Sequence, residues 1–77
     1  MRGPVLKGRD SLVVMVNSKP REVEADATVV LLLEVLGLAQ QRVAVEVNGE
    51  LVTRRDWGQY KLREGDRVEV VSFVGGG

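Results

Sequence analysis

The sequence contains no cysteine and no histidine among its 77 residues. Without cysteine there is no disulfide framework, no thiolate nucleophile and no sulfur ligand for a metal. Without histidine the chain lacks the usual general base and the commonest ligand of transition metals. Asp and Glu are scattered along the chain rather than clustered, so we expect no metal site built from carboxylates. These absences argue against an enzyme that works by itself.

An excess of charge of one sign is also missing, because eleven basic and eleven acidic side chains cancel. We therefore expect neither nucleic acid nor an anionic membrane as a partner. Apolar runs are short, and the five residues 29–33 are far too few to span a bilayer. Residues 1–11 carry charges but no apolar signal-peptide core, so we expect a cytoplasmic protein.

A chain of this length forms one small domain, whose core is marginal and leaves little room for a buried catalytic cavity. Residues 1–11 combine Gly3, Pro4 and Gly8 with four charged residues and are interpreted as a flexible N-terminal extension. We expect the folded domain at residues 12–74. Residues 75–77 are then a flexible tail of three glycines.

Short apolar or alternating segments predict about five strands, at residues 12–16, 21–24, 43–47, 50–52 and 67–74. The continuous apolar character of residues 12–16 indicates a central strand. Residues 17–20 form a turn cluster after it. Asn48-Gly49 predicts a tight hairpin, since both central positions of its turn need positive φ. Residues 54–62 form an irregular crossover.

One helix is predicted after the second strand. Thr28 is its expected N-cap and Gly37 its expected C′ residue. Between them, four apolar residues recur at the spacing of one helical face: Val29, Leu32, Leu33 and Leu36. The order of elements predicts an α+β fold, in which the helix lies across one face of a mixed sheet and the first and last strands are adjacent at its centre.

The last predicted strand runs to Val74 and is followed directly by Gly75-Gly76-Gly77. Glycine has no side chain, so this tail is a thin extension of roughly 3.3–3.6 Å per residue that can enter a narrow channel. The carboxylate of Gly77 is the one chemically distinctive group able to reach another protein's active site. Three glycines alone are equally compatible with a frayed end or a linker.

The context of the tail resembles the ThiS family, the ubiquitin-like sulfur carrier proteins of thiamine biosynthesis. The most specific features are Val52-x-Arg54-x-x-Trp57 and the Glu64-Gly65-Asp66 turn that leads into a valine-rich strand and the glycines. The resemblance covers about residues 12–77 and implies the β-grasp fold. The chain departs from the family at Thr53, where many members have proline, and in its N-terminal extension.

A further departure is the apolar outer face of the helix, which is often polar in the family. Three residues form it: Val30, Leu31 and Val35. A helix that is apolar all round needs cover, so this face is a candidate surface for a partner or a second copy.

The resemblance implies a carrier protein acted on by partner enzymes. In the family an E1-like adenylating enzyme uses ATP to activate the terminal carboxylate, a sulfur donor such as a cysteine desulfurase supplies sulfur, and thiazole synthase receives it. By this resemblance Gly77 carries the sulfur as a thiocarboxylate, while Gly75 and Gly76 enter the partner's active site. No cofactor is expected on the chain itself, because ATP is used by the activating partner.

The last strand also suggests where a partner docks. If Val68 and Val70 face the helix, then Val71 and Phe73 point outward beside the tail. Together with Val74 they would form an apolar docking site, unless the crossover covers this face. Trp57 is interpreted as a core residue under the crossover. Arg54 is the arginine that we expect to contact acidic groups of the activating enzyme.

Two other functions stay open. The small subunit of molybdopterin synthase and the ubiquitin-related modifiers share the fold and the Gly-Gly tail, so a related carrier with another client is an alternative. A passive ubiquitin-like domain that binds RNA or protein would not need the carboxylate of Gly77. A catalytic role ranks below both, because no nucleophile–base pair is available.

Overall fold

The first and last strands of the chain lie side by side in the middle of a five-stranded sheet. The computed structural model describes residues 11–73, in which β1 (Ser11–Val16) and β5 (Arg67–Ser72) run parallel. The sheet order is β2-β1-β5-β3-β4, where β2 is Lys19–Glu24, β3 is Val43–Val47 and β4 is Glu50–Val52. The other three pairings are antiparallel. The predicted mixed sheet, with its first and last strands adjacent, is confirmed.

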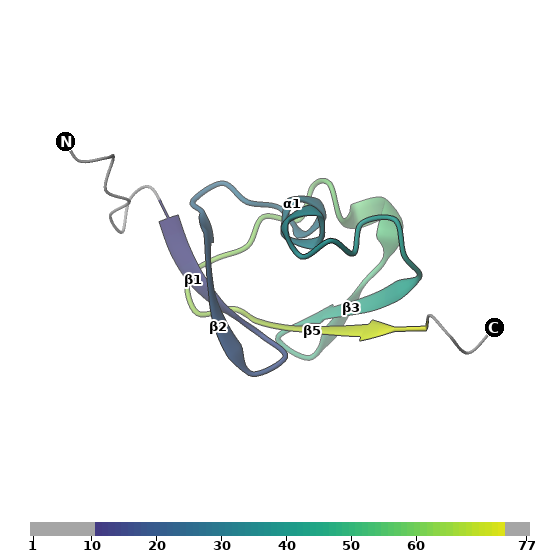
Figure 1. Cartoon of the computed structure of the whole chain (residues 1–77). Helices are drawn as coiled ribbons and strands as arrows, with labels where there is room; N and C mark the ends of the chain where they lie inside the picture. Colours follow the sequence, from purple (N-terminus) through teal and green to yellow (C-terminus); the bar gives the residue numbers. More distant parts are fainter. Residues whose placement is uncertain (1–10, 74–77) are drawn as a thin grey trace.

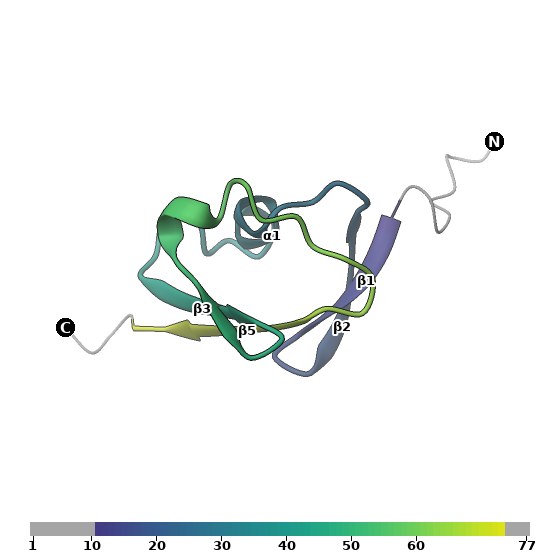
Figure 2. The same ribbon diagram turned by 180° about the vertical axis from the view of Figure 1, so that it is seen from behind.

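Helix α1 (Val29–Val35) lies across one face of this sheet (Figures 1 and 2). Residues 43–47 of β3 and 67–71 of β5 alternate buried residues with half-buried or exposed ones, as the period of two predicts. The largest wholly buried side chains come from both layers: Val14, Val29, Leu32, Leu33, Val45, Val47 and Val68. No helix within residues 11–73 is both long enough and apolar enough to cross a membrane.

The predicted ends of the elements agree with the local geometry. The Thr28 hydroxyl accepts a hydrogen bond from the amide of Leu31 at 3.2 Å, which confirms Thr28 as the N-cap. Gly37 has a φ of 77°, the left-handed conformation expected of a residue that ends a helix. Asn48 and Gly49 have φ values of 53° and 87°, as the hairpin prediction requires.

The predicted turn at residues 17–20 is too long. The structure makes the turn from Asn17 and Ser18, both with positive φ, and β2 begins at Lys19. Val16 and Lys19 flank the two-residue turn and form a hydrogen-bonded pair. Pairs alternate along an antiparallel ladder, so the next pair, Met15 and Pro20, is a non-hydrogen-bonded pair. The nitrogen of Pro20 therefore faces the outer side of an edge strand, where the lack of an N–H breaks no ladder bond.

The outer face of α1 is less exposed than its sequence suggests. Val30 and Leu31 are half-buried against the core, and Val35 is 52% exposed. The helix has only seven residues and lies between β2 and the crossover, so both of its flanks are covered. Of the three apolar residues expected to be exposed on this face, Val35 alone is exposed. Leu31 lines a shallow groove beside β2.

Candidate functional site

Strand β5 leads the chain towards its glycine tail and is anchored up to the last described residue. Ser72 pairs with Val43, and the amide of Phe73 donates a hydrogen bond to the carbonyl of Arg42 at 2.9 Å. The predicted strand reached residue 74, whereas β5 ends at Ser72. Val74, Gly75, Gly76 and Gly77 lie outside the described residues, so the roles assigned to them stay predictions.

The Asn17 side chain holds the other edge of β5 beyond the end of β1. Its Nδ2 donates to the carbonyl of Val70 at 3.2 Å, and its Oδ1 accepts from the amide of Val70 at 2.8 Å. The backbone amide of Asn17 also donates to the carbonyl of Val68 at 2.8 Å. Strand β1 stops at Val16, so the side-chain amide of Asn17 takes the place of a further strand residue and bonds to the backbone of Val70. No sequence pattern predicted this contact.

We expect Asn17→Ala to lower the free energy of unfolding by about 2–3 kcal/mol, because Val70 loses two partners and alanine is strained at positive φ. Asn17→Gly is the matched control, since glycine accepts this φ but lacks the amide group. It should cost about 1–2 kcal/mol, measured by urea denaturation. If Asn17→Gly is as stable as the wild type, the side-chain bonds to Val70 contribute nothing measurable.

The outer face of the sheet, opposite α1, carries an exposed apolar surface near the end of β5. Val68 and Val70 are buried, whereas Val71 and Phe73 are 55% and 57% exposed. The predicted outward orientation is therefore confirmed, and the crossover does not cover Phe73. Two further residues share this face through the strand register, namely Ala44 opposite Val71 and Leu51 opposite Glu46. Leu51 is 64% exposed and was not singled out from the sequence.

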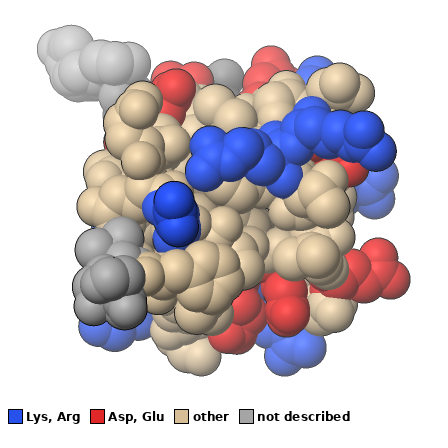
Figure 3. All heavy atoms as spheres, turned by 90° about the vertical axis from the view of Figure 1, so that its right-hand side faces the viewer, with Lys and Arg blue, Asp and Glu red and all other residues tan. Residues whose placement is uncertain are grey.

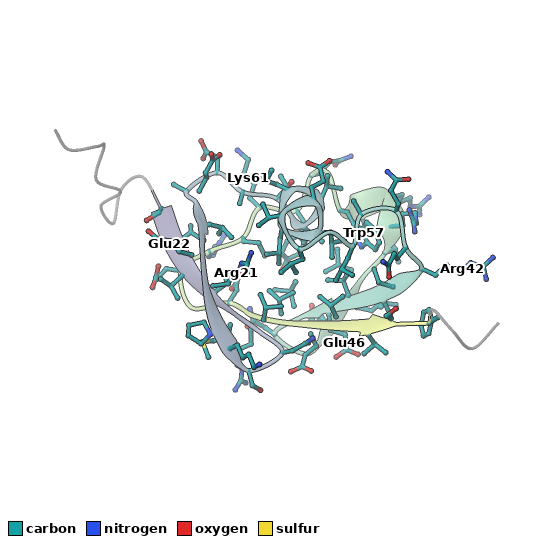
Figure 4. All side chains as sticks on the ribbon, in the orientation of Figure 1. Arg21, Glu22, Arg42, Glu46, Trp57 and Lys61 are labelled. Atoms are coloured by element: carbon teal, nitrogen blue, oxygen red, sulfur yellow. The ribbon has the colours of Figure 1, made fainter. Side chains whose placement is uncertain are left out.

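Trp57 closes the core beneath the crossover, as predicted. It is 4% exposed, lies between α1 and β3 (Figure 4), and its Nε1 donates to the carbonyl of Val52 at 2.9 Å. The guanidinium of Arg54 stacks on the Trp57 ring at 4.7 Å from its centroid. Arg54 also donates to the carbonyl of Gln41 at 3.3 Å. It therefore lies at the end of the sheet, not on the outer apolar face with Val71 and Phe73.

Two surface hollows are lined by residues that indicate no particular ligand or reaction. One of about 240 Å³ is lined mainly by apolar side chains between β2 and α1. The other, of about 540 Å³, is lined by polar residues: Asn48, Gln59, Tyr60, Lys61, Arg63 and Asp66. In the part of the chain that the structure describes, no three Asp or Glu side chains gather as metal ligands. Of the predicted site residues that the structure describes, Val71 and Phe73 lie together on the outer face at the end of β5.

Comparison with known proteins agrees with this arrangement. The sequence profile of the ThiS family matches residues 14–77. This range includes the second half of β1, all the later helices and strands, and the three glycines. The chain belongs to the ThiS family. Its resemblance to that family, inferred from Val52, Arg54, Trp57 and the turn before β5, is confirmed.

Individual relatives support the same assignment. The chain is 30% identical over 64 residues to the sulfur carrier protein ThiS of Escherichia coli K12, covering 83% of this chain and 97% of that protein. A crystal structure of the thiamine biosynthesis protein ThiS from Geobacter metallireducens has 38% identity and a TM-score of 0.72, covering 86% of this chain and all of that one. The structural likeness confirms the ubiquitin-like β-grasp fold.

A different kind of relative is much longer than this chain. The chain is 44% identical over 64 residues to a thiazole synthase of Magnetococcus marinus, covering 83% of itself but 20% of that protein. A thiazole synthase of Paramagnetospirillum magneticum matches over the same length at 39% identity. The chain therefore spans about a fifth of the length of these two relatives.

Proposed function

We propose that this ThiS-family protein is a sulfur carrier of thiamine biosynthesis, whose Gly77 carboxylate is adenylated and then converted to a thiocarboxylate. The observation that carries the proposal is its similarity, over 83% of this chain and 97% of the relative, to the sulfur carrier protein of E. coli. The structure adds a physical reason, because β5 is held on both edges and directs the chain towards Gly75-Gly76-Gly77.

The chemistry needs activation of the carboxylate by a partner. A carboxylate is a poor electrophile because its charge is delocalised and oxide would be the leaving group. When a Gly77 oxygen attacks the α-phosphate of ATP, pyrophosphate leaves and the acyl group is joined to AMP. The terminal sulfur of a persulfide on the donor can then displace AMP at the acyl carbon, and a thiol reductant cleaves the resulting acyl disulfide to the thiocarboxylate. The nucleotide and the catalytic groups belong to the partner, and the chain supplies a handle for the transferred group.

The glycines suit this role because of their size. From residue 74 to residue 77 an extended tail spans at most about 13–14 Å, enough to place the carboxylate inside a partner while the folded domain stays outside. A Cβ at Gly76 or Gly77 would widen the part of the tail that enters the narrowest region. The absence of histidine and cysteine is then consistent with a carrier rather than a catalyst.

Thiazole synthase is the client that we propose. The two long relatives named thiazole synthase each match this chain over 64 residues, so a segment similar to the carrier occurs within proteins of that name. This supports delivery of sulfur to thiazole formation over delivery to molybdopterin synthesis, for which none of the relatives described above is named.

Intact-mass measurement tests the proposal directly. The protein ending at Gly77 is incubated with ATP, a ThiS-activating enzyme, a cysteine desulfurase, cysteine and a thiol reductant. The expected product has a mass increase that matches replacement of one oxygen by one sulfur, and fragmentation places it on Gly77. If the fully active mixture leaves the mass unchanged while it converts the E. coli carrier, the proposed function is wrong.

We further expect the outer apolar face to dock on the adenylating partner. The double variant Val71→Ser/Phe73→Ser should raise KM for the carrier by about tenfold or more, with little change in kcat, because an apolar contact beside the tail is lost. Both side chains are more than half exposed, so stability should change little. The measurement is the initial rate of pyrophosphate release at varied carrier concentration.

Val13→Ser is the matched control for this experiment. Val13 is 39% exposed on the outer face of β1, where it pairs with Glu22, and it lies away from the end of β5. Its substitution should leave KM within about twofold of the wild type. Docking by this face is refuted if the double variant and the control behave alike.

A further inference from the structure

Three arginines lie at the end of the sheet from which the tail departs. Arg42 precedes β3, while Arg54 and Arg55 belong to the short 3₁₀ helix η1 (Arg54–Asp56). All three are exposed. Figure 3 views the molecule from this end and shows Lys and Arg side chains gathered across it. We call Arg42, Arg54 and Arg55 the arginine cluster.

Hydrogen bonds connect part of this cluster to Phe73, at the base of the tail. The carbonyl of Arg42 accepts the hydrogen bond from the amide of Phe73, the last described residue. The carbonyl of the preceding residue, Gln41, accepts the hydrogen bond from Arg54. The backbone of Arg42 and the side chain of Arg54 are therefore held close to Phe73. Any protein that receives the tail must come close to these guanidinium groups.

The charge of the cluster is not neutralised within the described chain. No hydrogen bond or ion pair joins the side chain of Arg42 or Arg55 to another residue between 11 and 73. Figure 4 shows the Arg42 side chain directed away from the rest of the protein. The nearby Asp56 carboxylate instead accepts a hydrogen bond from the Thr53 hydroxyl at 3.1 Å. A chain with no net charge thus presents a local positive surface at one end.

The length of the tail indicates what this surface contacts. An extended tail from residue 74 to residue 77 spans about 13–14 Å, which is longer than an arginine side chain. With the Gly77 carboxylate at the nucleotide, the arginines cannot reach the phosphates and must meet the rim of the channel. The anions available on the rim of a protein channel are Asp and Glu carboxylates. A carboxylate can accept two parallel hydrogen bonds from one guanidinium.

We propose that the arginine cluster docks on a carboxylate-rich rim around the tail channel of the adenylating partner. The proposal rests on the proposed carrier function and adds the chemistry of the partner's surface. Paired charges at the rim of an interface act mainly on the rate of encounter, and salt screens them. The cluster thus guides the tail to its channel, while the apolar face beside Phe73 contributes contact area.

The test compares two double charge reversals in the complete protein. Arg42→Glu/Arg55→Glu removes the proposed contacts, and Arg54 is left in place because it packs on Trp57. Lys61→Glu/Arg63→Glu makes the same change of net charge outside the cluster, and Figure 4 shows Lys61 on the other side of α1 from Arg42. Both pairs are exposed, and circular dichroism with thermal unfolding verifies that each variant folds. The readout is kcat/KM for pyrophosphate release, at low salt and at about 0.15 M salt.

We expect Arg42→Glu/Arg55→Glu to lower kcat/KM by about tenfold or more at low salt, with kcat little changed, and to weaken its dependence on salt. Lys61→Glu/Arg63→Glu should stay within about twofold of the wild type. Equal losses of kcat/KM in both variants would show a general effect of net charge. An unchanged kcat/KM in both would show that the arginine cluster does not contact the rim of the partner's channel. Either result overturns the inference. If the wild type itself is never adenylated, the carrier function fails, and this inference fails with it.

Discussion

Removal of Gly77 is expected to abolish activation of the protein while leaving its fold intact. Deletion shortens the tail by about 3.5 Å, so the carboxylate of Gly76 would stop short of the α-phosphate of ATP. A misplacement of even about 1 Å can cost 10²-fold in rate, and we therefore expect pyrophosphate release to fall by at least about 10²-fold. Gly77→Ala should also reduce activation, because its Cβ enters the narrowest part of the channel.

Gly58→Ala is a suitable control for the tail variants. Gly58 lies in the crossover, has no atom within 4 Å of the position where a Cβ would be added, and does not have a positive φ. This substitution should leave both activation and stability close to those of the wild type. Thermal unfolding should be the same for all the variants. Normal activation of the protein that lacks Gly77 would be incompatible with a carrier function.

Truncation of Trp57 to alanine is expected to have the largest effect on stability. The side chain is 4% exposed and packs under the crossover, so Trp57→Ala leaves a large cavity and an unpaired Val52 carbonyl. Losses of about 3–5 kcal/mol are typical of such changes. A domain of this size has a total stability of roughly 4–12 kcal/mol, so the variant should lose a large share of it. Urea denaturation followed by circular dichroism measures the change.

Two substitutions separate the causes of that loss. Trp57→Phe keeps most of the apolar volume but removes the Nε1 donor, and should cost less than the alanine variant, about 1–3 kcal/mol. Arg54→Ala removes the stacked guanidinium and should cost about 0.5–1 kcal/mol. If Trp57→Ala costs no more than Arg54→Ala, Trp57 is not the core residue that its burial indicates.

The predictions for Gly77 and Trp57 distinguish residues that serve the proposed activation from residues that stabilise the fold. Trp57 and the valines of β3 and β5 hold a small core together, whereas Gly77 carries the proposed chemistry. The proposed chemistry at Gly77 requires no internal cavity for a substrate in the domain. The exposed Val71 and Phe73 and the arginine cluster are then the features by which a partner can recognise the folded part.

Local patterns in the sequence were sufficient for most of the fold. The spacing of Leu32 and Leu33 after Thr28 predicted α1, and Asn48-Gly49 predicted the second hairpin, because helical periodicity and positive φ are properties of neighbouring residues. The first hairpin was misjudged at Pro20. Whether a proline is tolerated in a strand depends on which side of the strand is unpaired, and that is known only once the sheet order is known.

The sequence by itself therefore determined the class of fold, the outward direction of Val71 and Phe73, and the glycine tail with its candidate carboxylate. The tertiary structure decided which distant residues surround the base of that tail. Asn17 bonds to Val70 because β1 ends beside β5, and Arg42 bonds to Phe73 because β3 pairs with β5 on the other side. These contacts depend on strand register across long separations in the chain, which no local periodicity encodes.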